Sequence, residues 1–98
     1  MFMEETKENL RRVQAPAILI DWLLAQGMLA STGTAESEPD LIEAHKWFNL
    51  AVVKGSVLAA QYRQEISKEM CLRDIAEAQC RARLWLSSEV EERQDLVA

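Results

Sequence analysis

The sequence predicts an all-α protein built from antiparallel helical hairpins, with four main helices and, before them, a short helix or arm. Three observations lead to this prediction. The chain of 98 residues has only three glycines and two prolines, so little in it interrupts a helix. Its apolar residues, 49% of the chain, recur at the helical spacings of three and four. No stretch alternates apolar and polar residues for long enough to indicate a β-strand.

The first two segments differ in how strongly they favour a helix. Residues 1–14 hold good helix formers but few apolar anchors, so we expect a weak helix or an arm there. Pro16 suits the first turn of a second helix that extends to about Ala30. Gly27 costs this helix up to ~1 kcal/mol relative to alanine, so we expect the backbone of a neighbour to come close to it. The apolar stripe of this helix comprises Ile18, Leu19, Trp22, Leu23 and Met28.

The chain is organised around the helix from Asp40 to Gly55, which follows a loop at residues 31–39 rich in turn residues. Two capping registers are open at its start, Ser37 with Asp40 or Asp40 with Glu43, and the sequence does not distinguish them. A lysine and then Gly55 mark its end, because the cation suits the helix dipole and glycine adopts the left-handed conformation.

This central helix has three distinct sides at ~100° per residue. One side is apolar, the second is a polar strip interrupted by Leu50, and the third is more apolar than a surface helix requires. We therefore expect the helix to be covered on two sides, as the middle helix of a small bundle. The first side holds Ala44, Trp47, Phe48 and Ala51, the second Glu43, Lys46 and Lys54, and the third Ile42, His45, Asn49, Val52 and Val53.

Two further helices complete the prediction. Ser56 is a suitable cap for a helix from Val57 to about Glu69, which the short connection makes antiparallel to the central helix. The last helix runs from Leu72 to about Ser87. We expect residues 88–98, a charged tail, either to continue it or to fray. Alanines leave hollows that aromatic rings of a neighbouring helix can fill, and these are Ala44, Ala51 and Ala59.

A skeleton of small and aromatic residues runs through the middle of the chain: Gly27, Gly33, Asp40, Ala44, Trp47, Phe48, Ala51, Gly55 and Ala59. Together with the segment EAHKWFNLAVVKG, this skeleton resembles the Sel1-like repeat, an α/α-hairpin repeat of the tetratricopeptide (TPR) superfamily. A later pattern, from Arg63 to Trp85, is similar to the helix that closes such arrays. The resemblance implies that residues 15–87 form a fragment of a Sel1/TPR-like α–α superhelix, with one full repeat, a partial repeat before it and a closing helix.

The resemblance has two departures from the family pattern. Trp22 stands where the repeat normally places an alanine, and only one full repeat is evident. Repeats of this kind bury their faces against neighbours and usually need about three units. Either the chain's own end segments cap the stack, or another chain completes it.

Composition and charge argue against several classes of partner. The net charge of −5 disfavours nucleic acid, because the basic spots at Arg11–Arg12 and at Arg81 and Arg83 are flanked by acidic residues. The N-terminus lacks the order of a signal peptide, and the longest apolar run, residues 15–30, is too short to span a bilayer. The two cysteines are too few for a disulfide framework. We expect a soluble, unexported, cytoplasmic protein that does not bind membranes.

No catalytic constellation emerges from the sequence. His45 is the only histidine, and it shows no metal-ligand spacing with Cys71 or Cys80. Arg73 lies near Cys71 and would favour a reactive thiol, although Cys71 is better explained as a substitute for a helix cap. We therefore expect no enzyme, no metal, no cofactor and no small-molecule substrate.

The resemblance implies a protein–protein interaction or adaptor module, whose partner is another protein or a second copy of the chain. The residues expected to meet the partner are Ile42, His45, Asn49, Val52 and Trp85. An internal role, in which the closing helix covers the third side of the central helix, stays open. The alternatives in function are a small homo-oligomerising helical unit and, more distantly, a thiol- or histidine-dependent enzyme.

Overall fold

The computed structural model describes residues 15–97, with side chains up to residue 89. Within this part of the chain every regular element is a helix, so the all-α prediction is confirmed for the residues described. The helices are α2 (Ala17–Thr32), α3 (Leu41–Val53), α4 (Val57–Ser67) and α5 (Leu72–Val97). The helix or arm expected at residues 1–14 lies outside the described residues.

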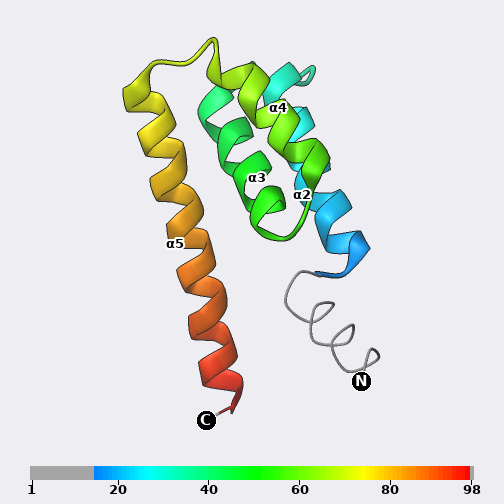
Figure 1. Ribbon diagram of the computed structural model, residues 1–98, viewed down its shortest axis with the longest axis vertical. Helices are drawn as coiled ribbons and strands as arrows, with labels where there is room; N and C mark the ends of the chain where they lie inside the picture. The colour runs from blue at the N-terminus through cyan, green and yellow to red at the C-terminus, as the bar shows by residue number, and fades with distance from the viewer. Residues whose placement is uncertain (1–14, 98) are drawn as a thin grey trace, which may run out of the picture.

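Helix α3 is the centre of the fold, because α2, α4 and α5 each pack on it. Figure 1 shows α2, α3 and α4 reversing direction one after the other, while α5 runs beside α3 in the same direction. Helices α4 and α5 make no extensive contact with each other. The expected middle position of α3 is therefore confirmed, and its neighbours cover three sides rather than two.

Local hydrogen bonds define the ends of the two short helices. The Asp40 carboxylate accepts a hydrogen bond of 3.1 Å from the backbone N–H of Glu43, which is one half of the second capping register. The reciprocal half does not form, because the N–H of Asp40 donates to the carbonyl oxygen of Ala30 at 2.8 Å. The Ser56 hydroxyl accepts one of 3.0 Å from the N–H of Ala59 and starts α4 as predicted. Gly55 has a φ of 117°, the left-handed backbone for which glycine is suited.

The core is built mainly from alanines and a few large side chains. Alanine at a contact lets two helix axes approach closely without losing side-chain entropy. The three alanines predicted to leave hollows for neighbouring side chains, Ala44, Ala51 and Ala59, are fully buried. The remaining buried hydrophobic residues are Leu23, Phe48, Leu50, Ala78 and Ala82.

Gly27 faces a side chain rather than a neighbouring backbone, which corrects the expectation from the sequence. A Cβ atom added at Gly27 would lie 2.5 Å from Cδ1 and 3.0 Å from Cζ of Phe48. The same ring stacks on Tyr62 of α4, with centroids 5.4 Å apart and an interplanar angle of 24°. Phe48 thus ties α2, α3 and α4 together, and only a glycine at position 27 leaves room for it.

The polar strip of α3 faces α5 instead of solvent. Glu43 accepts hydrogen bonds from Lys46 (2.9 Å) and from Arg81 of α5 (2.7 Å), and the interrupting residue Leu50 is fully buried. Burial alone would raise the pKa of Glu43, but these two cations outweigh it and hold the pKa below its usual value. At the other end of the strip, Lys54 donates to a carboxylate of α5, that of Glu89, at 2.8 Å. Residues 88–97 continue α5, the first of the two alternatives left open for the tail.

Candidate functional site

The residues predicted to meet a partner divide between two sides of α3. Ile42, Asn49 and Val52 are half-buried, and Asn49 is hydrogen-bonded to Arg63 of α4, whereas α5 packs on the side of Glu43 and Lys54. Trp85, on α5, is half-buried and reaches Trp47 of α3. Since Trp47 and Asn49 are about 200° apart around the helix, Trp85 does not share a surface with the other predicted residues.

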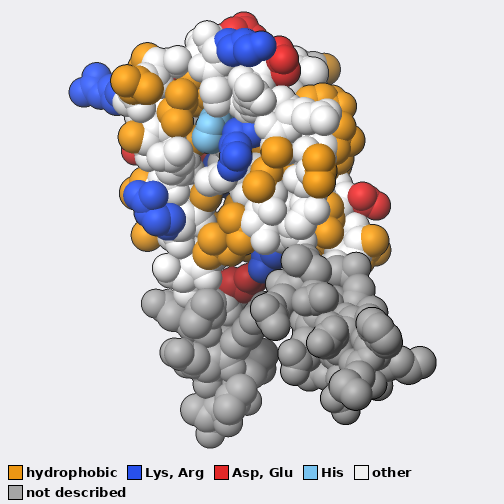
Figure 2. All heavy atoms as spheres, viewed as in Figure 1, with side chains coloured by type: hydrophobic (Ala, Val, Ile, Leu, Met, Phe, Trp, Pro, Cys, Tyr) orange, Lys and Arg blue, Asp and Glu red, His pale blue; other side chains and the backbone are white. Residues whose placement is uncertain are grey.

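A side of α3 is left between α4 and α5, and we call it the open side. It holds Ile42, Asn49 and the neighbouring Val53, which is 57% exposed. Figure 2 shows this face, with hydrophobic side chains gathered between α5 and α4 and basic side chains among them. The sequence placed Val53 on the third side of the helix but did not select it. Val53 is exposed because α4 and α5 lie apart from each other, and a local sequence pattern does not predict that separation.

Arg63 of α4 is the cation on the open side. Its Nη1 donates a hydrogen bond of 2.6 Å to Oδ1 of Asn49, and the side chain is half-buried. Among the described residues no carboxylate lies within ion-pair distance of Arg63. A guanidinium binds carboxylates with more than one parallel donor, so this one retains capacity for an acidic group.

His45 lies beneath the open side and not on it. Its side chain is 2% exposed, and its Nδ1 has no hydrogen-bond partner in the described part of the structure. Burial, and then the positive charge of Arg63, lower the pKa of His45 below its usual value. The imidazole is therefore neutral in the folded protein near pH 7. Because its side chain is buried, His45 cannot contact a partner, which corrects the expectation from the sequence.

The buried histidine predicts a pH dependence of stability. The unfolded chain takes up a proton at His45 near its ordinary pKa of 6.5, whereas the folded chain does so only at a lower pH. We expect the free energy of unfolding to decrease as the pH falls through 6.5 toward the folded-state pKa, by at most about 1.4 kcal/mol per pH unit. Urea unfolding at several pH values measures this slope. The variant His45→Gln should lose it, and an equal slope in both proteins would contradict the assignment.

Three tryptophans form a row across α2, α3 and α5. The Trp22 and Trp47 rings meet edge to face at 5.4 Å between centroids, and the Trp47 and Trp85 rings do so at 6.4 Å. Trp22 stays 47% exposed although its ring is held by Trp47. The sequence singled out Trp85 alone, because residues 22, 47 and 85 are brought together only by the packing of three helices.

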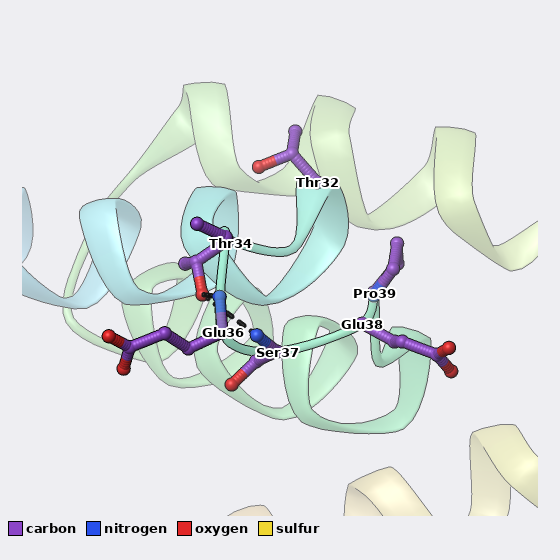
Figure 3. Close-up of a pocket in the computed structure, with 7 residues that line it drawn as sticks. Thr32, Thr34, Glu36, Ser37, Glu38 and Pro39 are labelled. Carbon is purple, nitrogen blue, oxygen red and sulfur yellow. Dashed lines mark hydrogen bonds between the residues drawn. The ribbon is translucent and has the colours of Figure 1, made fainter.

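The loop between α2 and α3 encloses a shallow hollow of about 310 Å³. Its lining residues all lie between Thr32 and Pro39. Figure 3 shows Thr34 turned inward to the loop, where its hydroxyl accepts hydrogen bonds from the N–H groups of Glu36 (3.2 Å) and Ser37 (3.1 Å). Among the described residues, only the end of α2 and the loop that follows it line the hollow, so it offers a ligand a single exposed edge.

Other candidate chemistry is sparse in residues 15–97. Cys71 and Cys80 are both exposed, and neither is in a disulfide. No three histidine, cysteine or carboxylate side chains of the described residues are grouped so as to hold a metal ion. None of the described helices combines the length and the apolar character needed to cross a membrane.

Comparisons with protein-family models, with curated proteins and with solved structures find no match to this chain. Function is therefore inferred from the residues and their geometry. The geometry offers two features that an isolated helical domain does not need: the open side of α3 and a set of exposed large hydrophobic side chains.

Proposed function

We propose that the chain is a non-enzymatic protein-interaction module, an adaptor built from Sel1-like helical hairpins. The proposal is supported by the structural roles of the residues that resemble the Sel1-like repeat. Gly27 admits the ring of Phe48, while Asp40 and Gly55 stand at the two ends of α3. Ala44 and its fellow alanines are buried at helix contacts. At each of these positions the structural role depends on the residue type, as expected when a repeat pattern specifies those residues.

The placing of α5 also supports a stack of hairpins. In helical-repeat proteins the hairpins stack side by side, and a terminal unit has a polar outer face. Here α3 and α5 run in the same direction, since Glu43 pairs with Arg81 and Lys54 pairs with Glu89. The outer side of α5 carries exposed polar residues, among them Arg73, Glu77, Arg83 and Ser87, together with the exposed Leu84. The proposal treats α5 as the closing helix of the array.

The observation that carries the proposal is the open side of α3. Apolar side chains there, Ile42 and Val53, flank a half-buried arginine that lacks a carboxylate. Protein interfaces combine an apolar centre with polar groups that set orientation, and arginine is enriched among their anchors. The surface fits a protein segment that places an apolar side chain against Val53 and an acidic group near Arg63.

The partner in this proposal is a protein, with no role for nucleic acid, membrane or small-molecule substrate. The net charge of −5 supports the first of these exclusions. The proposed location is the cytoplasm. The free, exposed thiols of Cys71 and Cys80 support a reducing compartment.

Substitution on the open side tests the proposal. Proteins captured by the intact chain and identified by mass spectrometry should be lost with Val53→Glu, because an exposed apolar contact becomes a charge. For an identified partner we expect the Kd to rise at least about tenfold, or 1.4 kcal/mol. Leu84→Glu is the matched control, since Leu84 is 63% exposed on α5 away from this side. Equal binding by wild type and Val53→Glu would overturn the proposal, as would equal loss in both variants.

A further inference from the structure

Helix α2 carries an apolar stripe that the described residues leave largely exposed. Ile18 is 81% exposed, Trp22 47% and Leu29 51%, and Ala25 is exposed as well. Their spacings of four, three and four residues place all of them on one side of the helix. Leu23 and Gly27 are buried on the other side. The helix is thus apolar both where it meets α3 and where it meets solvent.

Charge is nearly absent from α2. Asp21 is its only ionisable residue, and it lies beside the stripe, about 70° from the middle of the stripe, and not within it. A helix that is apolar around its circumference is normally buried on all sides. The stripe therefore has the composition of an interface centre, from which charged residues are depleted.

We propose that the stripe binds the same stripe of a second copy of this chain, with the two α2 helices antiparallel about a two-fold axis. The spacing of the four residues is symmetric about the midpoint between Trp22 and Ala25. In this register Trp22 lies level with the partner's Ala25, and Ile18 lies level with the partner's Leu29. A two-fold interface must be complementary to itself, and this register sets the largest side chain beside the smallest.

Two further observations favour a second copy over other occupants. The pairing buries no charge, whereas six of the fourteen residues that precede Ala15 are charged and would find no ionic partner on the stripe. The Trp22 ring is held in place by its edge-to-face contact with Trp47 at 5.4 Å. An anchor that is ordered before association loses less conformational entropy when the complex forms.

This inference is independent of the proposed function, because it uses α2 and leaves the open side of α3 free. A dimer joined through α2 would also supply neighbouring helices of the kind that one repeat alone lacks. Each copy then presents its own open side to a partner protein. The two experiments use different variants, so either conclusion can fail without the other.

Sedimentation equilibrium of the intact chain, from low micromolar to submillimolar concentration, tests the association. We expect a monomer–dimer equilibrium that Ile18→Glu weakens at least about tenfold, since it places a charge on each side of the interface. Leu84→Glu adds the same charge elsewhere on the surface and should leave the equilibrium unchanged. A chain that stays monomeric throughout overturns the proposal, and so does a dimer that Ile18→Glu does not affect. If residues 1–14 cover the stripe instead, the chain is monomeric and Ile18→Glu lowers its stability.

Disulfide trapping tests the register, in a background in which Cys71 and Cys80 are replaced by serine. The two-fold axis brings Ala25 and the partner's Ala25 within about 4.5 Å along the helix axis, and separates Ile18 from the partner's Ile18 by about 16 Å. Under mild oxidation Ala25→Cys should form a linked dimer readily, and Ile18→Cys should not. Faster linking of Ile18→Cys would indicate parallel helices and contradict the proposed arrangement.

Discussion

Replacing Phe48 with alanine is expected to lower the free energy of unfolding by about 3–5 kcal/mol. The ring is buried, fills the space left by Gly27 and stacks on Tyr62, so its loss opens a cavity where α2, α3 and α4 meet. A domain of this size has a total stability of roughly 5–15 kcal/mol, so the variant loses a large part of it. Urea unfolding followed by circular dichroism measures the change.

The matched control for this prediction is Val53→Ala on the same helix. Val53 is 57% exposed, so its truncation creates no cavity and should change the stability by no more than about 0.5 kcal/mol. A loss below about 1 kcal/mol for Phe48→Ala would show that the α2–α3–α4 junction does not depend on this ring.

Gly27→Ala is expected to destabilise the protein by about 1–3 kcal/mol, although alanine is the better helix former by ~1 kcal/mol. The reason is steric, because the new Cβ would lie 2.5 Å from Cδ1 of Phe48. The ring or the whole of α2 would have to shift. The change in the urea midpoint at constant slope gives the stability difference.

A double-mutant cycle isolates the contact between the two residues. Phe48→Leu removes the outer ring atoms, among them Cε1 and Cζ, which lie close to Gly27. In that background Gly27→Ala should cost less than in the wild type or stabilise the protein, which gives a coupling energy of about 1 kcal/mol or more. Gly27→Ala would disprove the steric role of the glycine if it stabilised the wild-type chain by the helix-propensity difference alone.

Part of the candidate site follows from the sequence. The excess of apolar residues on the third side of α3 identified Ile42 and Asn49, which the structure leaves half-buried toward solvent. The same pattern also selected His45, which is buried. The helical period gives the direction in which a side chain points, but it does not show whether another helix covers that side. Arg63 was quoted only for its place in the repeat pattern. Its pairing with Asn49 depends on how α4 packs, and no local feature predicts that distance.

The sequence by itself determined the all-helical class of the described residues, the end of α3 and the start of α4, and it narrowed the start of α3 to two capping registers. Those features depend on short-range chemistry, such as the hydrogen bonds that cap a helix at Asp40 and Ser56 and the left-handed backbone at Gly55. Only the tertiary structure decided which sides of α3 are covered. The helical period alone assigns the polar strip of α3 to solvent. In the structure α5 packs on this strip, because Glu43 and Lys54 form ion pairs with α5 and Leu50 is buried between them. Pairings between residues 35 or more positions apart leave no local signal, so covered and open sides become distinguishable only when the helices pack.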